Sequence, residues 1–152
     1  MKVRLALVSV AVGAVAWAAV PANAAPGTFT VTGGGTISPG LQLAAPGSQS
    51  FTFSGSGYGT SGTYLGPISC TWSGNDTVGT LAQGAGSFSG TCTPLAGTEP
   101  ITGTYSRSLG SVTMSGRIGP APFVGNFTAA CVFAPGPPPS TAYQESCTFT
   151  VQ

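Results

Sequence analysis

The sequence predicts an all-β fold: a single-domain antiparallel β-sandwich or small β-barrel of about eight strands. Apolar and β-branched residues alternate with Ser and Thr along most of the chain, with the period of two that is typical of half-buried strands. The chain contains 24 Gly and 13 Pro residues, and many of them separate these runs at short intervals. After residue 24 no apolar stripe has the period of a helix. A sandwich and a barrel both hide sheet edges, so the pattern does not distinguish between these two folds.

The first strands surround a glycine cluster. Residues Thr28–Thr32 alternate cleanly and predict a strand, after which Gly33–Gly35 permits a sharp bend or bulge. Residues Thr36–Leu43 then predict a short edge strand interrupted by a Pro-Gly turn. Ser50–Ser54 is the next strand and carries two inward Phe residues. Residues 54–66 are rich in Gly, Ser and Thr, which is compatible with a loop or with a weak strand.

The middle of the chain predicts two hairpins. The first pairs Ile68–Ser73 with Gly84–Thr93, and each of these strands contains a cysteine on its apolar face. The second pairs Ile101–Arg107 with Ser111–Ile118. Its turn, Ser108-Leu109-Gly110, has three residues and a glycine where a positive φ is expected.

The C-terminal hairpin has the clearest pattern. Phe127–Phe133 and Cys147–Val151 both alternate, and the Pro-rich segment Ala134–Ala142 between them is expected to lie outside the sheet. Placing the two cysteines opposite each other turns every apolar residue of both strands to one face, whereas a one-residue slip would turn them all away. This register predicts the opposed pairs Phe127–Val151, Ala129–Phe149 and Cys131–Cys147.

The four cysteines predict two disulfides, because the chain also carries an export signal. Three connectivities are compatible with the sequence, and we favour Cys70–Cys92 with Cys131–Cys147, which close successive hairpins. Each would close a loop of roughly twenty residues and add about 3 kcal/mol of stability. The cysteine spacing is unlike that of a zinc site, and the chain has no histidine.

Residues Met1–Ala24 have the features of a secretory signal peptide. Lys2 and Arg4 precede the apolar run Leu5–Val20, and Ala22-Asn23-Ala24 matches a signal-peptidase site. The run is short for a membrane anchor, and no stop-transfer flank follows it. Cleavage near Ala24/Ala25 would leave residues 25–152 as one secreted domain, extracellular or at the cell surface.

The charge of the predicted mature chain limits its function. Five charged residues remain, Asp76, Glu99, Arg107, Arg117 and Glu145, for a net charge of −1. This balance argues against nucleic acid and anionic membranes as partners. Without His or Lys, the usual catalytic triads and Schiff-base chemistry are excluded, and no enzyme activity, cofactor or metal is expected. Outward Ser and Thr residues leave strand edges unprotected by charge, which favours self-association.

The candidate functional residues have two interpretations each. The acidic residues are expected to lie apart in solvated turns and the two arginines to face solvent. The first interpretation of Trp72 is that it packs in the core on the disulfide of Cys70. The second is that it stacks on a sugar, in a ligand-contact set formed by Tyr58, Tyr64, Trp72 and Tyr105.

The sequence also resembles known exported proteins. The Ala-Pro-Gly after the signal, the segment Gly-Gly-Gly-Thr-Ile-Ser-Pro-Gly-Leu at 33–41 and the two late hairpin disulfides resemble small secreted β proteins of high-GC Gram-positive bacteria. Within that group the chain is similar to the enediyne-antibiotic apoproteins, Ig-like sandwiches that carry an apolar chromophore in a cleft. Disulfides in that family close shorter loops, and no binding residue is transferred from it.

We therefore expect a secreted, non-enzymatic binding or interaction domain whose ligand is a small apolar molecule or a glycan. The alternative is a structural or self-assembling cell-surface protein, favoured by the nearly uncharged Ser/Thr exterior. A third hypothesis is a membrane-inserting β oligomer, since alternating strands of low charge also suit a lipid-facing barrel.

Overall fold

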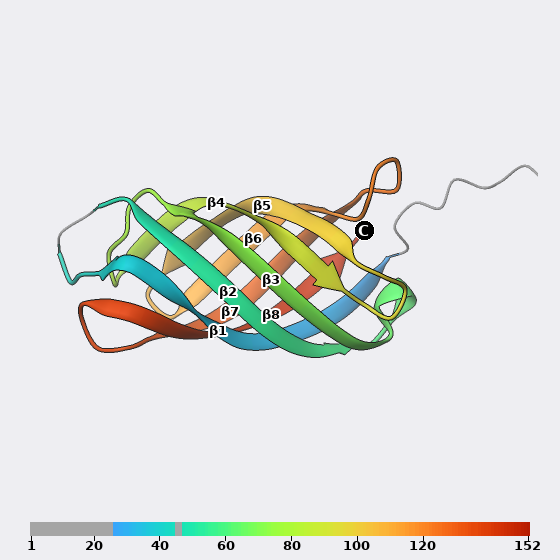
Figure 1. The fold of residues 1–152 in the computed structure, drawn as a ribbon, viewed down its shortest axis with the longest axis horizontal. Helices are drawn as coiled ribbons and strands as arrows, with labels where there is room; N and C mark the ends of the chain where they lie inside the picture. Colours follow the sequence, from blue (N-terminus) through green and yellow to red (C-terminus); the bar gives the residue numbers. More distant parts are fainter. Residues whose placement is uncertain (1–25, 45–46) are drawn as a thin grey trace, which may run out of the picture.

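The computed structural model describes residues 26–44 and 47–152, and these form a closed, eight-stranded antiparallel barrel (Figure 1). The predicted fold class is confirmed in its barrel form. Each strand pairs with its sequence neighbours, and the first closes on the last. The predicted signal peptide Met1–Ala24 lies outside the described residues. The strands are β1 (Gly27–Leu41), β2 (Gln49–Gly59), β3 (Gly66–Asp76), β4 (Gln83–Thr93), β5 (Glu99–Ser108), β6 (Ser111–Ile118), β7 (Gly125–Pro135) and β8 (Ser140–Val151).

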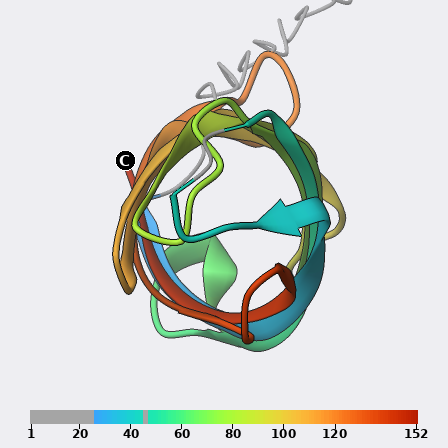
Figure 2. The same cartoon turned by 90° about the vertical axis from the view of Figure 1, so that its left-hand side faces the viewer.

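β1 corrects the prediction of two N-terminal strands. The strand runs through Gly33–Gly35 without a bend or bulge, in continuous register with β2 and β8. A Cβ atom at Gly33 or Gly35 would collide with a carbonyl oxygen of β2, so these glycines serve close strand approach in a tightly curved wall. The irregularity in the pairing with β8 lies later, between Thr36 and Leu41, where the end of β1 crosses the barrel mouth (Figure 2).

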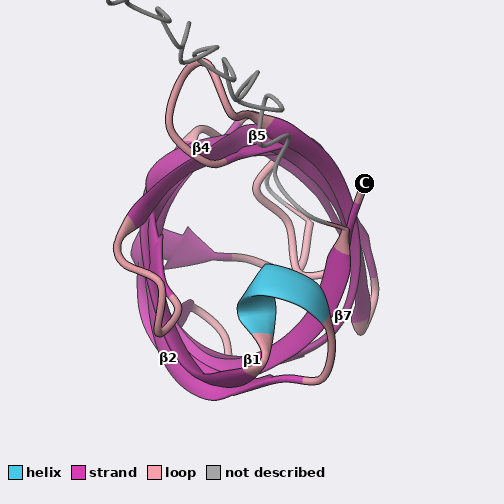
Figure 3. Cartoon of the chain, turned by 90° about the vertical axis from the view of Figure 1, so that its right-hand side faces the viewer, coloured by secondary structure: helices cyan, strands magenta, loops and turns pink. Residues whose placement is uncertain are grey.

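The glycine-rich segment that the sequence left open is partly strand. β2 continues to Gly59, and a short 3-10 helix, η1 (Gly62–Tyr64), follows. η1 lies across the other end of the barrel (Figure 3). Its Tyr64 is buried, with its ring centroid 4.9 Å from that of Phe29. One mouth is therefore closed by a buried aromatic side chain.

Both predicted disulfides are present, each between directly opposed residues of neighbouring strands. Cys70–Cys92 joins β3 to β4, and Cys131–Cys147 joins β7 to β8. The predicted register of the C-terminal hairpin is confirmed, with Phe127 opposite Val151 and Ala129 opposite Phe149. The connection is shorter than expected, because Pro135 still pairs with Tyr143 as the last residue of β7.

The barrel wall separates an aromatic interior from a hydroxyl-rich exterior. Inside, the Phe29 and Phe149 rings stack at 4.6 Å and the Phe53 and Trp72 rings at 4.0 Å. Outside, paired residues of neighbouring strands form a hydroxyl row, Ser87, Thr104, Ser115, Thr128 and Thr150. Among the described residues, no helix has the length and apolar character needed to cross a membrane.

The β5–β6 turn differs from its prediction in both length and conformation. Ser108 pairs with Ser111, so the loop contains two residues instead of three. Leu109, which is exposed, adopts a positive φ of 52°, the conformation that the sequence assigned to glycine. A side chain branched beyond Cβ is unfavourable in this region, whereas Asn tolerates it.

Replacing Leu109→Asn should therefore raise the free energy of unfolding by about 0.5–1 kcal/mol, measured by urea denaturation. Leu95→Asn is the matched control, since Leu95 is equally exposed in a loop but has no positive φ. An equal gain in both variants would show that removal of an exposed leucine, and not backbone strain, is responsible.

Candidate binding site inside the barrel

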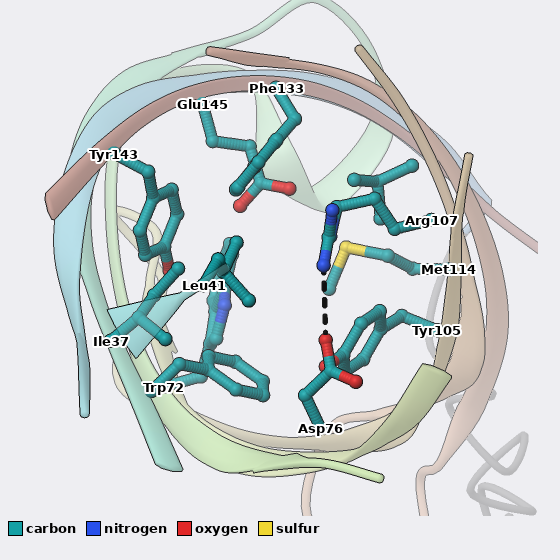
Figure 4. A pocket seen from close by; sticks show the side chains of 12 residues that line it. Ile37, Leu41, Trp72, Asp76, Tyr105, Arg107, Met114, Phe133, Tyr143 and Glu145 are labelled. Atoms are coloured by element: carbon teal, nitrogen blue, oxygen red, sulfur yellow. Dashed lines mark hydrogen bonds and ion pairs between the residues drawn. The ribbon is translucent and has the colours of Figure 1, made fainter. Parts of the chain in front are cut away.

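A cavity lies inside the barrel at the end opposite η1, with a volume of about 40 Å³. Inward side chains from most of the strands line it (Figure 4). Five aromatic side chains contribute to the walls: Phe51, Trp72, Tyr105, Phe133 and Tyr143. Four aliphatic ones complete the apolar part: Ile37, Leu41, Val112 and Met114. Three ionisable groups, Asp76, Arg107 and Glu145, point into the same space from β3, β5 and β8. The interior is therefore apolar except for a charged cluster at one end.

Arg107 and Asp76 form a buried ion pair, with 3.3 Å between Nη2 and Oδ2. The guanidinium also donates to three backbone carbonyls, those of Thr80, Leu81 and Gln83. Asp76 Oδ1 accepts from three backbone N–H groups, those of Val78, Gly79 and Ala85. Both charges are thus paired and hydrogen-bonded, as buried charges must be.

The positions of Asp76 and Arg107 correct two predictions. Asp76 does accept the turn hydrogen bonds expected of it, but it is buried instead of solvated. Arg107 does not face solvent, and its Cζ lies 4.9 Å from the Phe133 ring centroid. Gly84 makes the pairing fit, since a Cβ atom there would collide with the Asp76 carboxylate and lie 2.7 Å from Arg107 Nη2.

Glu145 is buried without a partner of its own. The residue is 7% exposed, and among the described residues its carboxyl makes no ion pair or side-chain hydrogen bond, although its oxygens stay accessible from the cavity (Figure 4). Burial raises its pKa from 4.5 to about 7, although the nearby Arg107 charge acts in the opposite direction. The prediction that no two acidic residues come together was wrong, because Asp76 and Glu145 line one cavity.

Glu145 also lies near two sulfur atoms, but this cluster is no metal centre. Its carboxylate and the sulfurs of Cys131 and Cys147 are within 4.8 Å of one another. The two sulfurs are joined in a disulfide, so neither is a thiolate that could bind a metal ion. The Glu145 carboxyl is left as the chemically available group.

Two tyrosines complete the polar lining. The Tyr143 hydroxyl donates to the Thr52 carbonyl over 2.8 Å, and burial raises the pKa of this phenol. Burial, and secondarily the Asp76 charge, raises the pKa of Tyr105, whose ring packs edge-on against Phe51. Both phenols stay neutral at ordinary pH, so the cavity's net charge depends on the three ionisable groups alone.

The four aromatic residues predicted as ligand contacts do not share a surface. Trp72 and Tyr105 line the cavity, and Trp72 is buried as its core interpretation required. Tyr64 lies at the opposite end, where its hydroxyl donates to Glu99. Tyr58 is on the outer face and 63% exposed. Sequence analysis missed the roles of Asp76, Arg107, Tyr143 and Glu145, although strand alternation places the last two on the face of Cys147.

No protein family, curated protein or solved structure matches this chain. The chemistry of the site therefore follows from its geometry. A cavity of this volume has room for about three water molecules or a ligand of similar size. It offers that ligand aromatic walls and one unpaired carboxyl.

The paired charges should be essential for stability. Arg107→Met leaves Asp76 buried without its counter-charge and should lower the free energy of unfolding by about 3–5 kcal/mol, measured by urea denaturation. Arg117→Met, at an exposed position on β6, is the control and should cost less than about 1 kcal/mol. Adding Asp76→Asn to Arg107→Met should recover part of the loss; no recovery would count against an unpaired charge as its cause.

Glu145 should make stability depend on pH. Its pKa is raised in the folded state, so its contribution is complete below the unfolded value of 4.5 and is lost as pH rises through about 7. The loss should approach about 3 kcal/mol. Glu145→Gln should remove this slope between pH 5 and 8, as followed by chemical denaturation across that range. A slope unchanged by the substitution would mean that another group titrates.

Proposed function

We propose that this chain is an exported binding protein that holds a small molecule inside its barrel, against Glu145. The observation that carries the proposal is a buried carboxyl, without a partner among the described residues, that faces a cavity. The carboxyl oxygens are reachable from the cavity, so a ligand or water there can hydrogen-bond to them, and the largely buried setting makes that partner important because desolvation of a charge costs stability. An eight-stranded barrel has an interior wide enough to hold one small ligand, and aromatic and aliphatic walls with a few polar groups are typical of binding sites.

Export is supported by the two disulfides, which form and persist in oxidising compartments. The predicted signal peptide agrees with this location. A carrier or receptor outside the cell would also benefit from a covalently stapled barrel, because its binding site is then kept shaped in the absence of ligand.

Catalysis is less well supported than binding. Two carboxyl groups in one cavity, one with a raised pKa, is an arrangement that glycosidases use. Here, however, Asp76 is engaged by Arg107 and three backbone N–H groups, and a pyranose ring is larger than the cavity. These observations favour a bound small molecule over a glycan substrate.

Self-association is a second candidate function. The hydroxyl row and its neighbours give the exterior a polar surface with very few charges, so copies of the chain would not repel one another. Closure leaves no unpaired edge among the eight described strands, so contacts made by the barrel must use its outer faces or loops. Concentration-dependent multimers in analytical ultracentrifugation would favour this function.

Native mass spectrometry of the protein secreted by its own cells tests the proposed function. We expect an excess mass that disappears on denaturation. Val112→Phe, which fills the cavity from β6, should abolish the excess, whereas Val132→Phe on the outer face of β7 should not. If neither the wild type nor Val132→Phe, both of which have an intact cavity, showed an excess mass, the proposal of a carried ligand would be contradicted.

A further inference from the structure

We propose that the cavity beside Glu145 is a site for a small organic cation, an alkylammonium of a few carbon atoms. This inference rests on the proposed function and names the ligand's chemical class. It depends on three features of the described cavity: its charge, its aromatic walls and its volume.

The charges in the cavity favour a cation. Asp76 and Arg107 neutralise each other in their ion pair, which leaves the Glu145 carboxylate as the uncompensated charge in the described lining. An isolated buried carboxylate is unfavourable, and a cation beside it relieves that cost. An anion would instead meet Glu145 itself, and Arg107 is already occupied by Asp76 and three backbone carbonyls.

The aromatic walls also favour a cation. The rings of Trp72, Tyr105 and Tyr143 line the cavity (Figure 4). The faces of aromatic rings attract cations, and most readily organic cations, which are weakly hydrated. The protein already uses this interaction once, since the Arg107 guanidinium lies 4.9 Å from the centroid of Phe133 in the same lining. A bound organic cation would therefore meet aromatic surroundings of the kind that the Arg107 guanidinium already has.

The volume of about 40 Å³ limits the cation's size. A water molecule requires roughly 10–15 Å³ measured in this way, so the space corresponds to about three waters. Ethylammonium, with three non-hydrogen atoms, matches it. A ligand this small binds weakly even in a good site, so ethylammonium serves as a probe with an expected Kd in the millimolar range, and a ligand retained through purification would carry the same ammonium group on a larger body.

The binding should depend on pH through Glu145. The other ionisable groups that face it are Arg107 and Tyr105 from β5, Asp76 from β3 and Tyr143 from β8, while the described lining from β1, β2, β6 and β7 has none. A proton on Glu145 competes with the cation, and its pKa is about 7. Ethylammonium stays charged well above this range, so its affinity should be about tenfold weaker at pH 6 than at pH 8.

The test is a fluorescence titration of the mature protein in amine-free phosphate buffer. Trp72 is the only tryptophan after the predicted signal peptide, and it lines the cavity, so its emission reports the site. Ethylammonium should change the emission saturably at pH 8, whereas ethanol and acetate, similar in size but neutral and anionic, should not. Equal binding of ethanol or acetate would overturn the inference.

Matched variants locate the binding. Glu145→Gln should weaken ethylammonium binding at least tenfold, whereas Glu99→Gln, at the opposite end beside Tyr64, should leave it unchanged. Should Glu145→Gln fail to fold, the pH dependence of the wild type tests the same group without a substitution. An ethylammonium affinity that changes neither with pH nor on Glu145→Gln would contradict the proposed site.

These outcomes are separable from the proposed function. A carried mass that proves neutral or anionic would overturn the cation inference while leaving a ligand-holding barrel in place. A protein that carries nothing when isolated, yet binds ethylammonium only when Glu145 is intact, would support the cation site while removing the support for a carried ligand.

Discussion

The pairing of β1 with β8 is the constraint on which the rest of the structure depends. It converts a meander of hairpins into a closed wall, and closure removes the open edges that most sheets must protect with charge. A chain with so few charged residues can therefore cover its exterior with Ser and Thr without leaving an edge exposed. Closure also means that alternate residues of all eight strands point into the same interior, and the residues between them point outward.

That shared interior is divided along the barrel axis. From η1 to the middle it contains buried, stacked aromatic rings, including Phe29 on Phe149 and Phe53 on Trp72. At the other end it contains three of the five charged residues that follow the predicted signal peptide. Burying these charged groups costs stability through desolvation, and the ion pair between Arg107 and Asp76 offsets the cost for those two residues only. The charge of Glu145 has no counter-charge of its own, and such local departures from the rules of stable structure are characteristic of functional sites.

Local pattern was sufficient to predict the strands, the hairpin register and both disulfides, because these depend on alternation between near neighbours in sequence. The choice between barrel and sandwich was not predictable, since it depends on residues of β1 and β8 that are about a hundred or more positions apart. Gly33–Gly35 was misread as a bend because a glycine needed for close strand approach looks the same as one needed for a turn. The charged cluster was missed for another reason: Arg107 and Glu145 were judged by residue type, although alternation from Ile101 and from Cys147 places both inside.

The two surfaces of the barrel differ in their ability to select a ligand. The exterior repeats the same hydroxyl groups from strand to strand, so neighbouring positions offer a ligand nearly the same contacts. The interior site instead has one unpaired carboxyl, that of Glu145 on β8, in a lining that includes aromatic rings from several other strands. In a space this small, shape alone distinguishes few molecules, whereas an uncompensated buried charge discriminates strongly between a cation, a neutral molecule and an anion. Selection by charge is therefore the property that the interior has and the exterior lacks.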